Sequence, residues 1–152
     1  MRVALLYPEV YDMARFRERR REFPPFGALY LAAAVENAGH DVTVIQVRPD
    51  QVGLDLVGFD AVGFSLASSA TYGFMQEARE RSRMDPGTLV MVGGVHANFY
   101  PTESLLDFRA DVVCEGESEE AILEVLDRAA AGSGSFAGVA GARWVEGGQI
   151  RA

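Results

Sequence analysis

The stretch Leu89-Val90-Met91-Val92-Gly93-Gly94-Val95-His96-Ala97 decides the fold of this chain. It begins as an unbroken apolar run, which is typical of a strand buried on both faces of a parallel sheet. Two glycines follow at the carboxyl end of this strand, where the absence of a Cβ atom lets a ligand approach the backbone closely. Ligands of open α/β sheets bind in the crevice outside the carboxyl ends of the strands. The stretch therefore predicts a parallel sheet with a ligand-binding edge.

Strands and helices are expected to alternate on both sides of this stretch. The expected strands are Arg2–Tyr7, Asp41–Val47, Ala61–Ser65, Leu89–Val92 and Asp111–Cys114. The expected helices are Gly27–Ala38, about Thr71 to Met84, Pro101–Phe108 and Ser118–Ala131. Strands joined by helices imply right-handed crossovers. The prediction is a doubly wound, flavodoxin-like α/β fold with five parallel strands in the order 2-1-3-4-5, followed by a small C-terminal hairpin at Ala142–Val145 and Gln149–Ile150.

The first helix has apolar residues at helical spacing, which predict its buried face. These residues are Tyr30, Leu31, Ala34, Val35 and Ala38, and Gly39 is expected to end the helix. Residues 1–132 are expected to form the α/β domain, and residues 133–152 a linker and the hairpin.

Composition narrows the class of protein. The chain has 152 residues, 49% of them hydrophobic, and a formal net charge of −8. This charge argues against general binding to nucleic acids or to anionic membranes, and the arginines between Arg15 and Arg21 are interpreted as a solvated face.

No run approaches the roughly 18–20 apolar residues of a membrane span, and the chain starts with a strand in place of a signal peptide. We therefore expect a cytoplasmic protein.

Cys114 is the only cysteine of the chain. A disulfide framework and a thiolate-only metal cluster are therefore excluded. Because Cys114 lies in an apolar stretch, it is expected to be a buried, inert thiol.

Several common ligands of this fold lack their binding motif. The first strand is followed by Pro8-Glu9-Val10-Tyr11, where a dinucleotide site needs Gly-x-Gly-x-x-Gly. The chain contains no lysine, so a P-loop is absent. Receiver domains are expected to carry an aspartate after the third strand and a lysine after the fifth, where this chain has Ser65 and Glu115. A flavodoxin-like phosphate loop is disfavoured because Glu9–Asp12 is too acidic to hold an anion.

Three strand-end loops carry the candidate binding residues. They are Ser65, Leu66, Ala67, Ser68, Ser69 and Thr71 after the third strand; Gly93, Gly94, Val95 and His96 after the fourth; and Glu115, Gly116 and Glu117 after the fifth. Short polar side chains beside bare backbone suit a large, flat or elongated ligand. For one loop alone, helix capping and turn formation are a simpler explanation. Three such loops side by side favour a ligand site.

Five motifs follow one another in a specific order. They are Pro24-Pro25-Phe26-Gly27, Ala38-Gly39-His40-Asp41-Val42, Asp60-Ala61-Val62-Gly63-Phe64-Ser65, Gly93-Gly94-Val95-His96-Ala97 and Glu115-Gly116-Glu117-Ser118-Glu119. Their order and spacing resemble the cobalamin (vitamin B12)-binding domain that precedes the barrel in cobalamin-dependent radical S-adenosylmethionine (radical SAM) enzymes. The segment from Phe136 to Ile150 is similar to the Gly-rich hairpin that connects such a domain to its barrel.

The resemblance implies a position for the cofactor. The nucleotide tail of cobalamin is expected beside the third and fourth strands. Ser65 and Ser69 match the hydroxyl-bearing residues that hold the tail, and Gly93-Gly94 matches the glycines against which the tail packs. The loop Glu115-Gly116-Glu117 is expected to form a further wall, and Leu66–Ser68 to face the corrin.

The resemblance also implies an unusual cobalt environment. Methionine-synthase-like relatives carry Asp-x-His-x-x-Gly after the first strand, and that histidine is the lower cobalt ligand. This chain has no histidine in Pro8–Gly27, so no protein imidazole is expected below the cobalt, which changes its electronics. His40 is interpreted as structural. His96 is interpreted as a possible hydrogen-bonding partner of the ligand and not as a cobalt ligand.

The implied function is that of a binding module. It would present the corrin to a radical SAM catalytic domain, in cis or in trans, for methyl transfer or another radical rearrangement. The iron–sulfur cluster of that family needs Cys-x-x-x-Cys-x-x-Cys, so the cluster and S-adenosylmethionine would belong to another domain, toward which the hairpin would lead. The chain alone is not expected to be catalytic, and an oligomer is conceivable. Two alternatives stay open: a stand-alone enzyme that uses Glu115, Glu117 and His96 as acid/base groups, and a degenerate domain that serves as an interaction scaffold.

Overall fold

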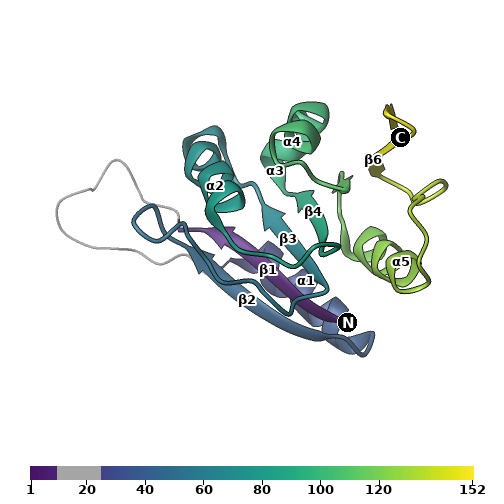
Figure 1. Ribbon diagram of the computed structural model, residues 1–152, viewed down its shortest axis with the longest axis horizontal. Coiled ribbons are helices and arrows are strands. Elements are labelled where there is room, and N and C mark those ends of the chain that lie inside the picture. Colours follow the sequence, from purple (N-terminus) through teal and green to yellow (C-terminus); the bar gives the residue numbers. More distant parts are fainter. Residues whose placement is uncertain (10–24) are drawn as a thin grey trace.

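The fold is known from a computed structural model that describes residues 1–9 and 25–152 (Figure 1). Its strands are β1 (Arg2–Pro8), β2 (Asp41–Val47), β3 (Ala61–Ser65), β4 (Leu89–Gly93), β5 (Val112–Cys114), β6 (Ala142–Glu146) and β7 (Gln149–Arg151). Its helices are α1 (Phe26–Asn37), α2 (Ser69–Arg81), α3 (Val95–Phe99), α4 (Pro101–Asp107) and α5 (Glu119–Ala130). The arginines between Arg15 and Arg21, interpreted above as a solvated face, lie outside the described residues.

All described strands belong to one sheet, with the order β2-β1-β3-β4-β5-β6-β7. The first five are parallel, which confirms the predicted order 2-1-3-4-5. The C-terminal hairpin also forms as predicted, but it extends the sheet: β6 pairs antiparallel with β5, and Trp144 lies opposite Val112. Trp144 is buried beneath this junction. The division of the chain at residue 132 stays a prediction.

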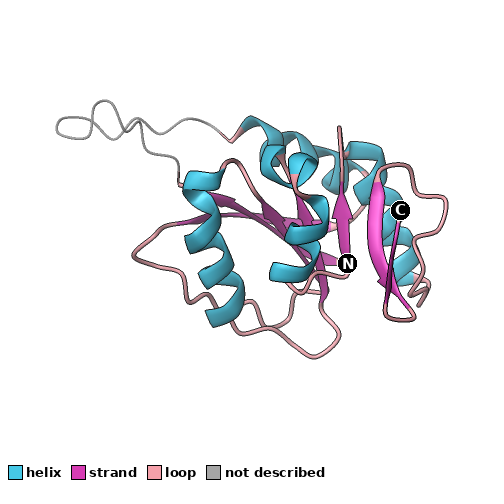
Figure 2. Ribbon diagram, turned by 90° about the horizontal axis from the view of Figure 1, so that it is seen from above, coloured by secondary structure: helices cyan, strands magenta, loops and turns pink. Residues whose placement is uncertain are grey.

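Helices cover the two faces of the sheet separately (Figures 1 and 2). α1 and α5 contact each other and pack on one face, over a core that includes Val3, Leu5, Met91 and Ile122. α2, α3 and α4 lie on the other face, over a core that includes Phe64 and Phe108. Residues that alternate along a strand point to opposite faces. Each face of the sheet therefore has its own side chains and its own core.

The buried stripe of α1 differs from the prediction. Ala28 and Val35 are buried, whereas Tyr30 is 67% exposed and Ala38 lies beyond the helix end and is exposed. Tyr30 lies two residues after Ala28, more than half a helical turn away from it, so it projects from the opposite side of the helix. Gly39 adopts a φ of +87° directly after the helix, in line with its predicted stop function.

Two local features concern the starts of α3 and α5. The residues after Gly94 form the short helix α3 and not a simple turn. Ser118 is the N-cap residue of α5, but its side chain makes no capping hydrogen bond. None of the helices that the structure describes is long and apolar enough to cross a membrane.

Candidate functional site

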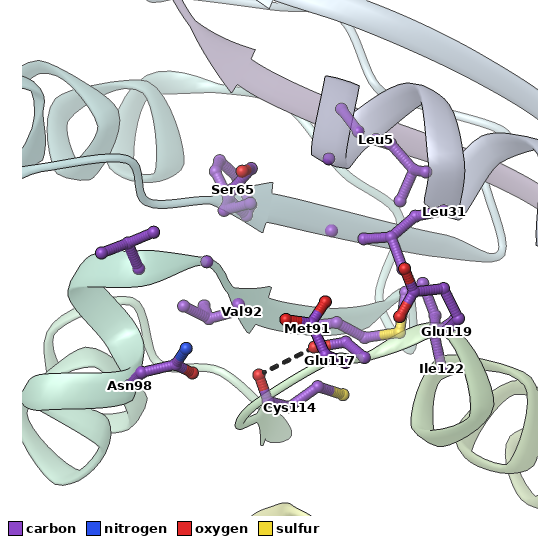
Figure 3. A pocket seen from close by; sticks show the side chains of 18 of the residues that line it. Leu5, Leu31, Ser65, Met91, Val92, Asn98, Cys114, Glu117, Glu119 and Ile122 are labelled. Atoms are coloured by element: carbon purple, nitrogen blue, oxygen red, sulfur yellow. Dashed lines mark hydrogen bonds between the residues drawn. The ribbon is translucent and has the colours of Figure 1, made fainter. Parts of the chain in front are cut away.

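A cavity of about 240 Å³ opens at the carboxyl ends of β1, β3, β4 and β5 (Figure 3). It lies on the side of the sheet that α1 and α5 cover, because both helices contribute residues to its wall. Its apolar part is formed mainly by side chains of β1, α1, β4 and α5: Leu5, Leu31, Met91 and Ile122. The cavity therefore has an apolar interior and lies at the edge where parallel sheets bind ligands.

Small residues explain why this space is not filled by the protein itself. Gly63 lies in the middle of β3, and a Cβ atom there would lie 3.0 Å from Cδ2 of Leu5 and 3.7 Å from Cε of Met91. Both neighbours line the cavity, so a side chain at position 63 would point into it. Gly27 and Ala28 line it from α1. The empty volume thus follows from residue size at these positions.

Polar groups surround the cavity where it opens. Figure 3 shows Ser65 at the end of β3, Asn98 on α3, and Glu117 and Glu119 at the start of α5. Hydrogen bonds fix the loop between β5 and α5: the Gly116 amide donates to Oδ1 of Asn98 at 2.9 Å, and the Ser118 hydroxyl contacts the Cys114 carbonyl at 3.2 Å. An apolar interior with a few positioned polar groups is typical of a small-molecule site.

The glycine pair at the end of β4, with Gly93 in the strand and Gly94 directly after it, is explained by contacts within the protein. Gly94 adopts a φ of +96°, and a Cβ atom there would lie 2.8 Å from the Leu66 carbonyl oxygen. At Gly93 the nearest atom would be the Cys114 carbonyl oxygen, at 3.3 Å. The protein's own main chain therefore presses against Gly94, although both glycines also line the cavity.

The structure brings together about half of the predicted site residues. Those that line the cavity are Ser65, Gly93, Gly94, Val95, Gly116 and Glu117. Leu66 is fully buried in the core on the α2–α4 side, and its amide and carbonyl are bonded to Gly93 and His96. Ala67, Ser68 and Ser69 lead into α2 outside the cavity lining. The Thr71 hydroxyl donates to the Ser68 carbonyl at 3.1 Å within the first turn, which matches the simpler structural explanation.

His96 is held in an aromatic stack. Its ring centroid lies 4.6 Å from that of Tyr72 and 5.0 Å from that of Tyr100. Burial and a 2.7 Å hydrogen bond to Asp107 raise the pKa of the Tyr72 hydroxyl. His96 thus packs against α2, and it is not among the residues that line the cavity. At the other end of the strands, Nδ1 of His40 lies 3.3 Å from the N-terminal nitrogen, consistent with a structural role.

This arrangement separates the three groups proposed for a stand-alone acid/base enzyme. Glu117 lines the cavity, Glu115 is paired with Arg143, and His96 belongs to the aromatic stack. Of the three, Glu117 alone is a residue of the cavity described above. Within residues 1–9 and 25–152, no cluster of three His, Cys, Asp or Glu side chains is placed to hold a metal ion.

Several lining residues were not anticipated from the sequence. They include Leu5, Gly27, Leu31, Gly63, Met91, Asn98, Cys114 and Ile122. Gly63 carried a usable signal, since a glycine inside an apolar strand often marks close approach of another group. Cys114 is buried as predicted, and burial raises the pKa of its thiol to about 12; however, it also forms part of the cavity wall.

Comparisons with known proteins find similarity to cobalamin-binding domains. The family model described as "B12 binding domain" matches residues 14–126. A solved structure of the radical S-adenosylmethionine methyltransferase TsrM from Kitasatospora setae, with cobalamin and a [4Fe-4S] cluster bound, is similar with a TM-score of 0.72 at 16% identity, over 97% of this chain and 30% of that one. A second TsrM structure, with tryptophan substrate and a SAM analogue, gives 0.72 at 15% identity over 99% and 29%. This chain therefore spans less than a third of the length of those enzymes. No curated protein matches it significantly.

Proposed function

This chain belongs to the B12-binding domain family, and from that premise we propose that it binds cobalamin with the nucleotide arm of the cofactor in the cavity between β3, β4, α1 and α5. The observation that carries the proposal is the cavity itself, at the carboxyl edge of the sheet and next to Gly63. Ser65, Gly93, Gly94, Val95, Gly116 and Glu117 are the predicted site residues that this proposal retains as cavity contacts.

The residues present fit such an arm. Cavities that enclose a whole ligand typically measure about 300–1,000 Å³, and about 240 Å³ suits one arm of a larger molecule. The benzimidazole base at the end of the arm is flat and mostly apolar, and Leu5, Met91 and Ile122 offer it an apolar surface. The Glu117 carboxylate at the mouth accepts hydrogen bonds, which suits the amide side chains of a corrin ring.

The corrin ring is proposed to lie over the edge of the sheet. Large apolar side chains on α1 and α3 are exposed there: Phe26 at 66%, Tyr30 at 67%, Val95 at 61% and Phe99 at 75%. We propose that a ligand or a partner covers these side chains. When bound, cobalamin supplies a cobalt centre that can carry a methyl group. The chain's own residues would bind and orient it.

No imidazole of this chain is proposed as a lower cobalt ligand. The chain contains two histidines; His96 lies in the stack with Tyr72 and Tyr100, and His40 lies beside the N-terminus. Axial ligands tune the electronics of a metal cofactor. A cobalt without a protein imidazole would differ in this respect from that of methionine-synthase-like proteins.

We further propose that the chain acts as the cofactor-holding part of a radical SAM methyltransferase. The similarity to TsrM over about 30% of that enzyme's length supports this assignment. The iron–sulfur cluster and S-adenosylmethionine would then be held by a catalytic domain, in cis or in trans, which docks over the exposed apolar edge. Cytoplasmic localisation stays a prediction that accompanies this proposal.

The test is cofactor retention. The protein is mixed with hydroxocobalamin, desalted, and its visible spectrum is recorded. We expect one corrinoid per chain, and reduction to the Co(II) form should give an electron paramagnetic resonance spectrum without coupling to an axial protein nitrogen. Absence of retained corrinoid overturns the binding proposal, and a coupled axial nitrogen that ¹⁵N-histidine labelling alters overturns the proposed absence of a histidine ligand.

A further inference from the structure

The loop between β5 and α5 forms one wall of the cavity, and it is held from outside the cavity as well as by Asn98. Gly116, Glu117 and Ser118 line the cavity, whereas Glu115 does not. Glu115 instead contacts the C-terminal hairpin, which follows it by more than twenty residues. The wall of the site and the hairpin are therefore in direct contact.

Two hydrogen bonds join Glu115 to the hairpin segment. Its amide donates to the Gly141 carbonyl at 2.7 Å, and its Oε1 accepts from Nε of Arg143 at 2.9 Å. The two side chains are only 26% and 27% exposed. A sheltered, charge-assisted hydrogen bond is stronger than a neutral one and is screened less than a surface ion pair.

Gly141 shows that the two segments are in close contact. It adopts a φ of +75°, and a Cβ atom there would lie 2.6 Å from the Glu115 carbonyl oxygen. Only glycine accommodates both this backbone conformation and this distance. The approach of the hairpin to Glu115 is thus built into the sequence.

The hairpin is held firmly against the rest of the sheet. β6 pairs with all three residues of β5. Trp144 is 4% exposed and packs edge-to-face against Phe136. Arg143 lies between two buried residues of β6, on the opposite face of the strand, and reaches Glu115 from there. Because its strand is paired and packed in this way, the Arg143 side chain is well positioned to hold the loop between β5 and α5.

Charge adds to the need for Arg143. Glu115, Glu117, Glu119 and Glu120 form an acidic run around the start of α5. Arg143 offsets the charge of Glu115, and without it the Glu115 carboxylate would be left to repel its neighbours. Gly116, with a φ of +78°, gives the loop the freedom to move if it is released.

We propose that the C-terminal hairpin holds the Glu115–Ser118 loop in its cofactor-binding conformation, and that Arg143 is the positioning residue through which it does so. The proposal rests on the proposed cobalamin site, since the loop is a wall of that cavity. Anything that displaces the hairpin, including a domain attached to it, would then change cofactor affinity without touching the cofactor.

The test compares Arg143→Ala with a matched control on the same hairpin. Arg151 pairs with Glu146 at 3.9 Å, and both side chains are nearly half exposed, so Arg151→Ala removes an arginine without releasing the loop. Hydroxocobalamin affinity is measured by absorbance titration. Amide hydrogen exchange of Glu115–Ser118 is measured in the protein without cofactor. We expect Arg143→Ala to weaken binding roughly tenfold and to speed exchange of these amides, as loss of a sheltered charged hydrogen bond predicts. Arg151→Ala should change neither.

Glu115→Gln keeps the shape of the side chain and guards against misfolding of the arginine variant. It should show the same two effects at smaller size, and the double variant should be less than additive. Unchanged exchange in Arg143→Ala, or equal losses of affinity in Arg143→Ala and Arg151→Ala, would overturn the proposal. If the wild-type protein binds no cobalamin, the proposed function fails, while the exchange experiment still decides whether Arg143 holds the loop.

Discussion

The two faces of the sheet differ in whether protein side chains fill the space between the strands and the helices that cover them. On the α2–α4 side, aromatic rings occupy it: Phe108 lies 5.5 Å from both Phe64 and Tyr72, and His96 stacks on Tyr72. On the α1/α5 side, Gly63 and the small residues of α1 leave a cavity of about 240 Å³. The same strands thus support a closed core on one side and an open site on the other.

Alternation along β3 accounts for this difference. Val62 and Phe64 belong to the core on the α2–α4 side, while Gly63 lies opposite Leu5 and Met91 in the parallel register. Because side chains alternate between faces, a single large residue next to a single glycine assigns packing to one side and space to the other. The side of the cavity is therefore determined by residue size at alternating positions.

The largest effect is expected on the closed side. Phe108 is fully buried, so Phe108→Ala should lower the free energy of unfolding by about 3–5 kcal/mol, measured by urea denaturation. Cobalamin affinity of the folded fraction should stay within twofold of wild type. Tyr30→Ala, at a residue 67% exposed on α1, should change stability by less than about 0.5 kcal/mol. A Phe108 variant of normal stability would contradict the account of the closed side.

A substitution on the open side should mainly lower the affinity for cobalamin. Gly63→Leu would place a side chain between Leu5 and Met91 in the cavity, so we expect at least a roughly 100-fold loss of cobalamin affinity, with an overpacking cost of about 1–3 kcal/mol in stability. The control is Gly73→Leu on α2, where an added Cβ atom meets nothing within 4 Å. Titration with hydroxocobalamin compares the two. Equal affinity of both variants would show that the arm does not occupy this space.

Variants of the two glycines at the end of β4 distinguish protein packing from ligand contact. Gly94→Ala forces a Cβ atom at positive φ against the Leu66 carbonyl, so the protein without cofactor should lose about 1–3 kcal/mol of stability. Gly93→Ala should lose less, because its nearest neighbour would lie at 3.3 Å. Thermal denaturation of the two variants checks this order. The reverse order would remove the packing explanation for Gly94.

The smallest effect at neutral pH concerns Cys114 in the cavity wall, because it appears only in alkaline solution. Burial raises the pKa of its thiol from 9.0 to about 12, so the thiol stays neutral in the folded protein while it ionises in the unfolded chain. This contribution to stability is complete below pH 9 and is lost as the pH rises from about 9 to 12, by up to about 1.4 kcal/mol per pH unit. Cys114→Ala should make the fall of stability over this window shallower. An unchanged slope would contradict the buried position of the thiol.

The sequence allowed the sheet order to be predicted, together with the edge at which the cavity opens, because apolar strand runs and turn residues are local signals. Ser65 and Gly93 were correctly placed at the edge for the same reason. The side of the sheet on which the cavity lies was not predicted, because the sequence does not show that the face carrying Gly63 is the one that α1 and α5 cover. Ser69 and His96 were consequently predicted as site residues, whereas Ser69 begins α2 and His96 stacks on Tyr72, both outside the cavity lining. The link between Glu115 and Arg143 was also missed, because nothing local indicates that β6 pairs with β5.

The central claim is that the cavity holds the nucleotide arm of cobalamin. Its most direct test compares the affinity of the wild-type protein for cobalamin with that for cobinamide, the corrinoid that lacks this arm. The account predicts that cobalamin binds at least roughly tenfold more tightly, a difference of about 1.4 kcal/mol, and that Gly63→Leu abolishes this preference. Equal affinities of the wild-type protein for the two corrinoids would contradict it.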